Sequence, residues 1–240
     1  MRKSRVHAVV ISSMLALVAS LPAPSTAQDV RTNKEMEDFV AKASTPAEHT
    51  ALSRHFIDMA ARYEADAETH AAMAAEYRRS PGNPNRRFGD PGIHCESIAQ
   101  RAREAATSAR ELATYHERLA AEGPTSSAKA PAKVPDLSMP KLRFPDLLPP
   151  KQARELDATA KTPADHVRLS KHFAAEAAQY KADADRHAAM ATGYRSANRR
   201  GRLEGAAIHC DRLVQKITEA ATGARDLAAY HEQVAAGTAK

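Results

Sequence analysis

The sequence predicts an all-α protein in which two tandem helical hairpins, products of an internal duplication, pack as a four-helix bundle joined by a proline-rich strap. Three observations support this prediction. Aromatic residues make up only 5% of the chain and tryptophan is absent, whereas alanine, glutamate, lysine and arginine, which favour helices, dominate. Two long segments occur twice. Each repeated segment is bounded by helix-capping or helix-breaking residues.

The duplication is visible without inserting a gap. Residues 45–79 align with residues 162–196, and 21 of the 35 positions are identical. Residues 93–121 align with residues 208–236, and 17 of the 29 positions are identical. All six tyrosines and both cysteines occur at matched positions. One supersecondary unit is therefore expected twice, as a first hairpin over 45–121 and a second over 162–236.

The first element along the chain is an expected export signal. A basic start, MRKSRVH, precedes an apolar run from Ala8 to Leu21 that is too short to span a bilayer comfortably. The letters STA at Ser25–Ala27 have the form of a cleavage site, so residues 1–27 are predicted to be a signal peptide. No later segment is long and apolar enough to span a membrane. We expect a periplasmic or secreted protein.

Cleavage of this signal bears on the partners. It removes three basic residues and lowers the formal net charge from +6 to +3, which is too small to indicate a nucleic-acid partner. No CxxCH, P-loop or GxSxG motif occurs, so covalent haem, nucleotide hydrolysis and serine hydrolase chemistry are not indicated. We expect that the protein is not an enzyme.

Each hairpin begins with a helix-start signal, TPAE at residue 45 and TPAD at residue 162. Threonine stands at the N-cap, proline at the first helical position and an acid at the third, close to a capping box. The first helix of each hairpin is expected to continue to about Arg78 or Arg195. A loop rich in glycine, asparagine and arginine then leads to the second helix, which occupies the second aligned segment.

A segment of different composition, residues 122–152, connects the hairpins. It contains seven prolines, and those at 135, 140 and 145 are each followed two residues later by a leucine. This spacing predicts an extended strap that packs on an apolar groove, and the alternative is a disordered linker. The remaining segments are short: residues 28–44, the lead-in 153–161 and the tail 237–240.

Heptad spacing places unusual side chains where the helices meet. In the first helix of the first hairpin, positions that alternate in steps of three and four form one face. That face contains His49, Leu52, Phe56, Met59, Tyr63, Asp66, His70, Met73 and Tyr77. The second copy has Glu176 at the position of Met59 and otherwise repeats the same residue types. Histidine occupies positions where leucine would stabilise a bundle more, which indicates a function.

These residues predict soft-metal sites. Near its loop, each hairpin is expected to form a cluster of imidazole, thioether and thiol groups, which together suit Cu(I). The clusters are His70, Met73 and Cys95, and His187, Met190 and Cys210. Asp66 and Asp183 lie one turn before the histidines and are expected to bond to them and fix the tautomer. Secondary candidates lie near the open ends: His49, His116, His166 and His231.

The resulting prediction is an exported copper-binding bundle for metal buffering, storage or delivery. Its expected partners are a metal ion, a metal-delivery protein and, as an option, a second copy of the chain. Haem b held by bundle histidines is a minor alternative cofactor. The competing prediction is a metal-free structural or interaction module closed by a Cys95–Cys210 disulfide, as two cysteines in an exported protein commonly form one.

The relative orientation of the hairpins separates these predictions. Hairpins packed in the same sense would bring Cys95 and Cys210 together. Inverted hairpins would separate the cysteines and bring each soft cluster beside the other hairpin's histidine pair. The strap is long enough to allow inversion, and the sequence alone leaves both arrangements open.

Overall fold

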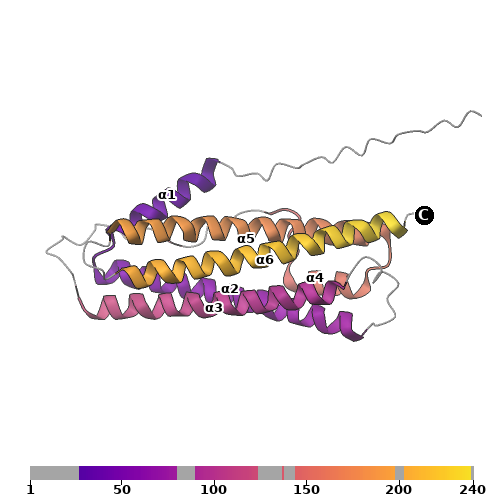
Figure 1. Cartoon of the computed structure of the whole chain (residues 1–240), viewed down its shortest axis with the longest axis horizontal. Helices are drawn as coiled ribbons and strands as arrows, with labels where there is room; N and C mark the ends of the chain where they lie inside the picture. The colour runs from indigo at the N-terminus through magenta and orange to yellow at the C-terminus, as the bar shows by residue number, and fades with distance from the viewer. Residues whose placement is uncertain (1–26, 80–89, 124–136, 138–143, 198–202, 239–240) are drawn as a thin grey trace, which may run out of the picture.

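The computed structural model describes residues 27–79, 90–123, 137, 144–197 and 203–238. These residues form six α-helices and no strand, so the prediction of an all-α protein is confirmed, and the helices pack as in a bundle (Figure 1). Within this part of the chain, no helix is long and apolar enough to cross a membrane. The expected signal peptide up to residue 26, and most of the strap, lie outside the described residues.

Four long helices make up the bundle: α2 (Pro46–Arg79), α3 (Pro91–Ala121), α5 (Pro163–Ala197) and α6 (Glu204–Thr238). Helix α2 packs against α3, α5 against α6, and α3 against α6. Figure 1 shows α5 and α6 stacked on α2 and α3 with their axes nearly aligned. Each helix agrees with its expected segment to within a few residues at either end.

The predicted capping boxes are present at the starts of α2 and α5. The Glu48 carboxylate accepts the N–H of Thr45 at 2.9 Å, and the Thr45 hydroxyl accepts the N–H of Glu48 at 3.3 Å. Thr162 and Asp165 repeat both bonds at 3.0 and 3.2 Å. Two backbone donors at each helix start are therefore satisfied by side chains, which defines where these helices begin.

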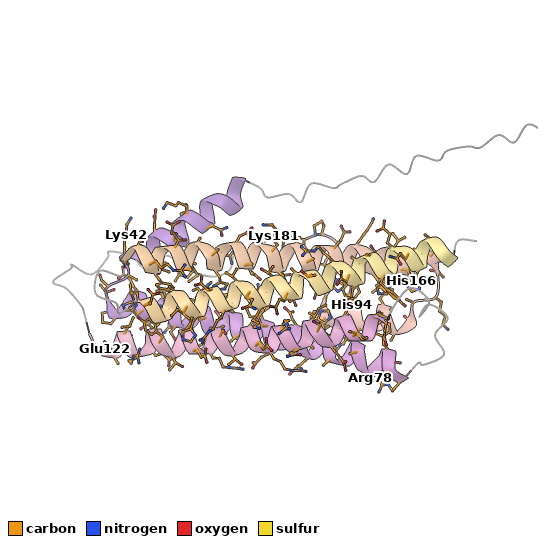
Figure 2. All side chains as sticks on the ribbon, viewed as in Figure 1. Lys42, Arg78, His94, Glu122, His166 and Lys181 are labelled. Carbon is orange, nitrogen blue, oxygen red and sulfur yellow. The ribbon has the colours of Figure 1, made fainter. Side chains whose placement is uncertain are left out.

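The α5/α6 unit is inverted relative to the α2/α3 unit. His94 of α3 lies 3.5 Å from Asp226 of α6, and Glu111 of α3 lies 2.9 Å from His209 of α6. Helices α3 and α6 are therefore antiparallel, because 17 residues forward along α3 correspond to 17 residues back along α6. Figure 2 shows the consequence, because His166, from the start of α5, lies at the same end of the bundle as Arg78 and His94.

The two helix contacts between the units differ in the size of the side chains. Helices α3 and α6 approach closely, since a Cβ added at Gly223 would lie 2.7 Å from Cγ1 of Ile98. Helices α2 and α5 are instead joined by long polar and aromatic side chains, among them the ion pair of Arg62 with Asp183. The chemistry-bearing residues therefore gather between α2 and α5 and at the two ends of the bundle.

Two further helices were not anticipated. Helix α1 (Ala27–Lys42) occupies the expected N-terminal segment and packs against α5, and α4 (Pro150–Thr159) begins in the expected strap and packs against α2 and α5. The approach of α1 is close, because a Cβ added at Gly193 would collide with the Glu37 carbonyl oxygen. Each short helix thus precedes one unit in sequence and covers a long helix of the other.

The described part of the strap is held by two histidines at matched positions. The Nδ1–H of His55 donates to the Leu137 carbonyl at 2.9 Å, and Nδ1 of His172 accepts the N–H of Leu148 at 3.1 Å. Leu137 and Leu148 also pack against the core. The expected contact of Leu142 lies outside the described residues.

Candidate functional site

Two imidazoles of the α2/α3 unit meet inside the bundle. Nδ1 of His49 lies 3.2 Å from Nδ1 of His116, and both side chains are buried. The Phe56 ring stacks on His116 with a centroid separation of 5.7 Å. We call His49 and His116 the first imidazole pair.

A tyrosine from the other unit completes this pair. The hydroxyl of Tyr194, on α5, lies 2.7 Å from Nε2 of His116. Burial raises the Tyr194 pKa well above its usual value, so the phenol stays protonated. The two nitrogens of His116 therefore have different partners, an imidazole on Nδ1 and a phenol on Nε2.

The α5/α6 unit has an equivalent second imidazole pair at the other end of the bundle. Nδ1 of His166 lies 3.0 Å from Nδ1 of His231. The Tyr77 hydroxyl, from α2, lies 3.4 Å from Nε2 of His231. Asp157 of α4 adds a carboxylate that accepts the Tyr77 hydroxyl and lies 3.7 Å from the same Nε2. The repeat spacing matches Asp157 to residue 40. That residue is a valine, so the first pair has no carboxylate from the matched position.

Burial favours the neutral form of three of these four imidazoles. It lowers the pKa of both His116 and His231 to about 3 and also lowers the pKa of His166. Burial raises the pKa of Asp157 to about 6. At neutral pH a neutral imidazole carries one nitrogen atom without a proton, and this is the form that binds metal ions.

The first predicted soft cluster is arranged differently from the expectation. Nε2 of His70 bonds to Glu176 of α5 at 2.9 Å, and its Nδ1 has no hydrogen-bond partner. Asp66 instead accepts the Tyr180 hydroxyl at 3.4 Å. The prediction that Asp66 bonds to His70 is therefore wrong, because Asp66 is directed to Tyr180 and a carboxylate of the facing helix bonds to His70 instead. Met73 is buried in the same core.

In the second cluster, His187 is fully buried and neither of its ring nitrogens has a hydrogen-bond partner. Asp183, its predicted partner, is bound by Arg62 and lies 3.8 Å from Arg186. The prediction that Asp183 bonds to His187 is therefore wrong. Met190 is buried nearby on the same helix, three residues further along.

The prediction of a Cys95–Cys210 disulfide is also wrong, because both cysteines are free and buried. The inversion of the units explains this. His94, the neighbour of Cys95, faces Asp226, which lies 16 residues along α6 from Cys210, or about 24 Å at 1.5 Å per residue. Burial raises the pKa of both thiols, so neither is a thiolate at neutral pH.

Across the described residues, no three histidine, cysteine, aspartate or glutamate side chains lie together so as to hold a metal ion. The structure instead brings together two imidazoles and a phenol at each end. The heptad pattern already contained both tyrosines, but their cross-unit contacts depend on the inversion. Asp157 was missed because its segment gave no helix signal. The chain matches no protein-family model, no curated protein and no solved structure.

Proposed function

We propose that the protein binds soft transition-metal ions, Cu(I) foremost, at its two imidazole pairs and acts as an exported metal buffer, store or delivery protein. One observation carries the proposal: at both ends of the bundle, two buried imidazoles face each other Nδ1 to Nδ1, 3.2 and 3.0 Å apart. Buried polar side chains at helix contacts cost stability, so their occurrence at both ends favours a role in binding.

The separation of the nitrogens suits one shared ion. With metal–nitrogen bonds of 2.0–2.1 Å, two nitrogens at these distances subtend an angle of about 90–105° at a common metal ion, somewhat below the tetrahedral value. Cu(I) accepts low coordination numbers, whereas structural zinc sites require four ligands. Among the described residues no third histidine, cysteine or carboxylate joins either pair, so the bent pair leaves the other positions of the ion to exogenous ligands, and Cu(I) needs fewer of these than zinc.

The outer nitrogens support the same assignment. A metal on Nδ1 places the imidazole proton on Nε2, and this N–H needs an acceptor. Tyr194 offers its hydroxyl oxygen to Nε2 of His116 at 2.7 Å. Asp157 and Tyr77 offer oxygens to Nε2 of His231 at 3.7 and 3.4 Å. These partners would hold His116 and His231 with the Nδ1 lone pair of each directed at its neighbour.

We further propose that the two units are hairpins that arose by duplication and form a four-helix bundle with an approximate two-fold axis. Contacts in matched positions support this. His94–Asp226 corresponds to Glu111–His209 at 3.5 and 2.9 Å. Arg101–Glu219 at 2.6 Å corresponds to Glu104–Lys216 at 3.0 Å. The imidazole pairs and their tyrosines follow the same relation.

The competing function is a metal-free structural or interaction module. Two neutral imidazoles at these distances also form an N–H···N hydrogen bond, and such a bond would satisfy the pairs without an ion. This candidate requires no disulfide. It predicts that the pairs take up no copper.

A titration with Cu(I) against a competing chelator tests the proposal. The reduced full-length chain is compared with His116→Phe/His231→Phe, which removes one imidazole from each pair. The matched control is His94→Phe/His209→Phe, which removes two histidines at equivalent positions outside the pairs. We expect the first variant to lose two Cu(I) per chain and the control to lose none. Equal uptake by all three proteins would show that the pairs bind no copper.

A further inference from the structure

One exchange between the two units changes the chemistry of an otherwise equivalent position. His70 of α2 is bonded to Glu176 of α5 at 2.9 Å. The counterpart of His70 is His187, and the counterpart of Glu176 is Met59. His187 therefore lacks the carboxylate that its counterpart has, and both its ring nitrogens are buried without a hydrogen-bond partner.

The register of α2 and α5 places Met59 opposite His187. The His70–Glu176 bond and the Asp66–Tyr180 bond, at 2.9 and 3.4 Å, show that four residues back along α2 correspond to four residues forward along α5. Seven further residues, about two turns, lead back along α2 from Asp66 to Met59 and forward along α5 from Tyr180 to His187.

A ring contact agrees with this register. The Phe56 ring, one turn from Met59 on α2, lies against the His187 ring with centroids 6.1 Å apart. Met59 is 1% exposed and His187 is 0% exposed. The thioether and the imidazole therefore both point into the layer between α2 and α5.

An imidazole with two unpartnered nitrogens in a protein core is uncommon and calls for a missing partner. Burial holds the His187 pKa well below its usual value, so the ring is neutral and offers a lone pair. Arg62 and Arg186 are the nearby cations, and Asp183 pairs with both. The net charge of these three groups is +1, which repels a monovalent ion less than a divalent one.

We propose that His187 and Met59 hold a Cu(I) ion between α2 and α5. The inference rests on the proposed function, that the protein binds soft metal ions, and adds a site with a different donor set. Imidazole nitrogen with thioether sulfur selects Cu(I), because zinc binds methionine poorly and magnesium and calcium take oxygen ligands. At the equivalent position, Glu176 occupies Nε2 of His70 and replaces the thioether, so no imidazole–thioether site forms there.

The test starts from His116→Phe/His231→Phe, in which the imidazole pairs are removed. Titrated with Cu(I) against a chelator, this variant is expected to retain one ion per chain, and X-ray absorption should show sulfur beside nitrogen around it. Adding Met59→Leu should abolish that uptake. Adding Met73→Leu, a buried methionine of the same helix, should leave it unchanged.

A gain-of-site variant keeps the proposal open to contradiction if Met59→Leu impairs folding. Glu176→Met removes the carboxylate from His70 and recreates the His187–Met59 chemistry there, so one additional Cu(I) per chain is expected. No uptake by the pair-deleted variant, or uptake without a sulfur neighbour, would overturn the His187–Met59 site. Loss of two ions on pair deletion would still support the proposed function in that case.

Discussion

The hydroxyl of Tyr194 lies 2.7 Å from Nε2 of His116, so a side chain of the α5/α6 unit completes an imidazole pair of the α2/α3 unit. The contact exists because the two units are inverted, and Tyr77 with His231 repeats it at the other end at 3.4 Å. Each imidazole pair therefore depends on both units, although its two imidazoles come from one.

Replacement of this tyrosine should weaken the first site. Tyr194→Phe leaves Nε2–H of His116 without an acceptor, which should lower Cu(I) affinity at that pair about 10–100-fold and the unfolding free energy by about 1–3 kcal/mol. Chelator competition and urea unfolding measure the two effects. Tyr180→Phe, whose hydroxyl bonds to Asp66, serves as the control. Unchanged Cu(I) affinity in Tyr194→Phe would argue against a metal on Nδ1.

The buried histidines should make the protein unstable in acid. Burial lowers the pKa of His116 and His231 to about 3 and of His55 to about 4, from a usual 6.5. Below pH 6.5 the unfolded chain then binds more protons at these sites than the folded chain does. The unfolding free energy therefore decreases as the pH is lowered. Asp66 and Asp157, whose pKa burial raises to about 6, oppose this between pH 3.8 and 6. Asp183, whose pKa burial also raises, opposes it as well, but burial lowers the pKa of six imidazoles in all.

The excess of imidazoles over carboxyls predicts a measurable slope of the unfolding free energy against pH. A net excess of one proton bound by the unfolded state lowers the unfolding free energy by about 1.4 kcal/mol per pH unit. Burial also lowers the pKa of further imidazoles, which add to the loss: His166, His172 and His187. Urea unfolding of the metal-free chain between pH 4.5 and 6 measures the slope. His116→Phe/His231→Phe should flatten it, and an equal slope in that variant would contradict the assignment.

The His70–Glu176 ion pair should stabilise the protein most in a limited pH window. Although burial opposes both charges, Glu176 raises the His70 pKa and His70 lowers the Glu176 pKa. The His70 contribution is complete below about 6.5 and is lost as pH rises through its folded pKa. The Glu176 contribution is complete above about 4.5 and is lost as pH falls through its folded pKa.

A double-mutant cycle measures this coupling. His70→Phe, Glu176→Leu and the double variant should give a coupling energy that is largest between pH 4.5 and 6.5, and each single variant should cost about 3–5 kcal/mol because it leaves a buried charge unpaired. The Lys181–Asp185 pair, which is exposed on α5, provides a control expected to contribute under about 1 kcal/mol. Coupling that does not vary with pH would contradict a charged pair.

Both cysteines should be free but unreactive in the folded protein. They are fully buried, and burial raises the pKa of each thiol, so little thiolate is available to attack a reagent. A thiol reagent should label no cysteine in native conditions and two after unfolding, without a reductant. Detection of an intramolecular disulfide by mass spectrometry would require an arrangement of the units other than the inverted one.

The sequence was informative about elements and much less about contacts between them. Capping boxes and breakers predicted the long helices because those signals are local, as at Thr45 and Glu48. The partner of His70 was assigned to Asp66, its neighbour along the helix, but the register of α2 against α5 brings Glu176 there instead. That register depends on the inversion, which no local pattern of residues specifies.

The role of Asp157 shows a second limit of local patterns. Its segment, PKQARELDAT, begins at the second of two consecutive prolines and is short, so its stability as a helix depends on packing against α2 rather than on its own propensity. Only that packing brings the carboxylate to Tyr77 and His231. A residue that reaches a site in this way carries no spacing signal in the sequence.

The most direct test of the account is the nitrogen NMR spectrum of the imidazoles during addition of Cu(I), which is diamagnetic. Binding at the pairs predicts that the Nδ1 resonances of His49, His116, His166 and His231 shift together while Nε2 stays protonated. Shifts at the Nε2 atoms, or pair resonances that do not respond to Cu(I) while other histidines do, would contradict metal binding by the imidazole pairs.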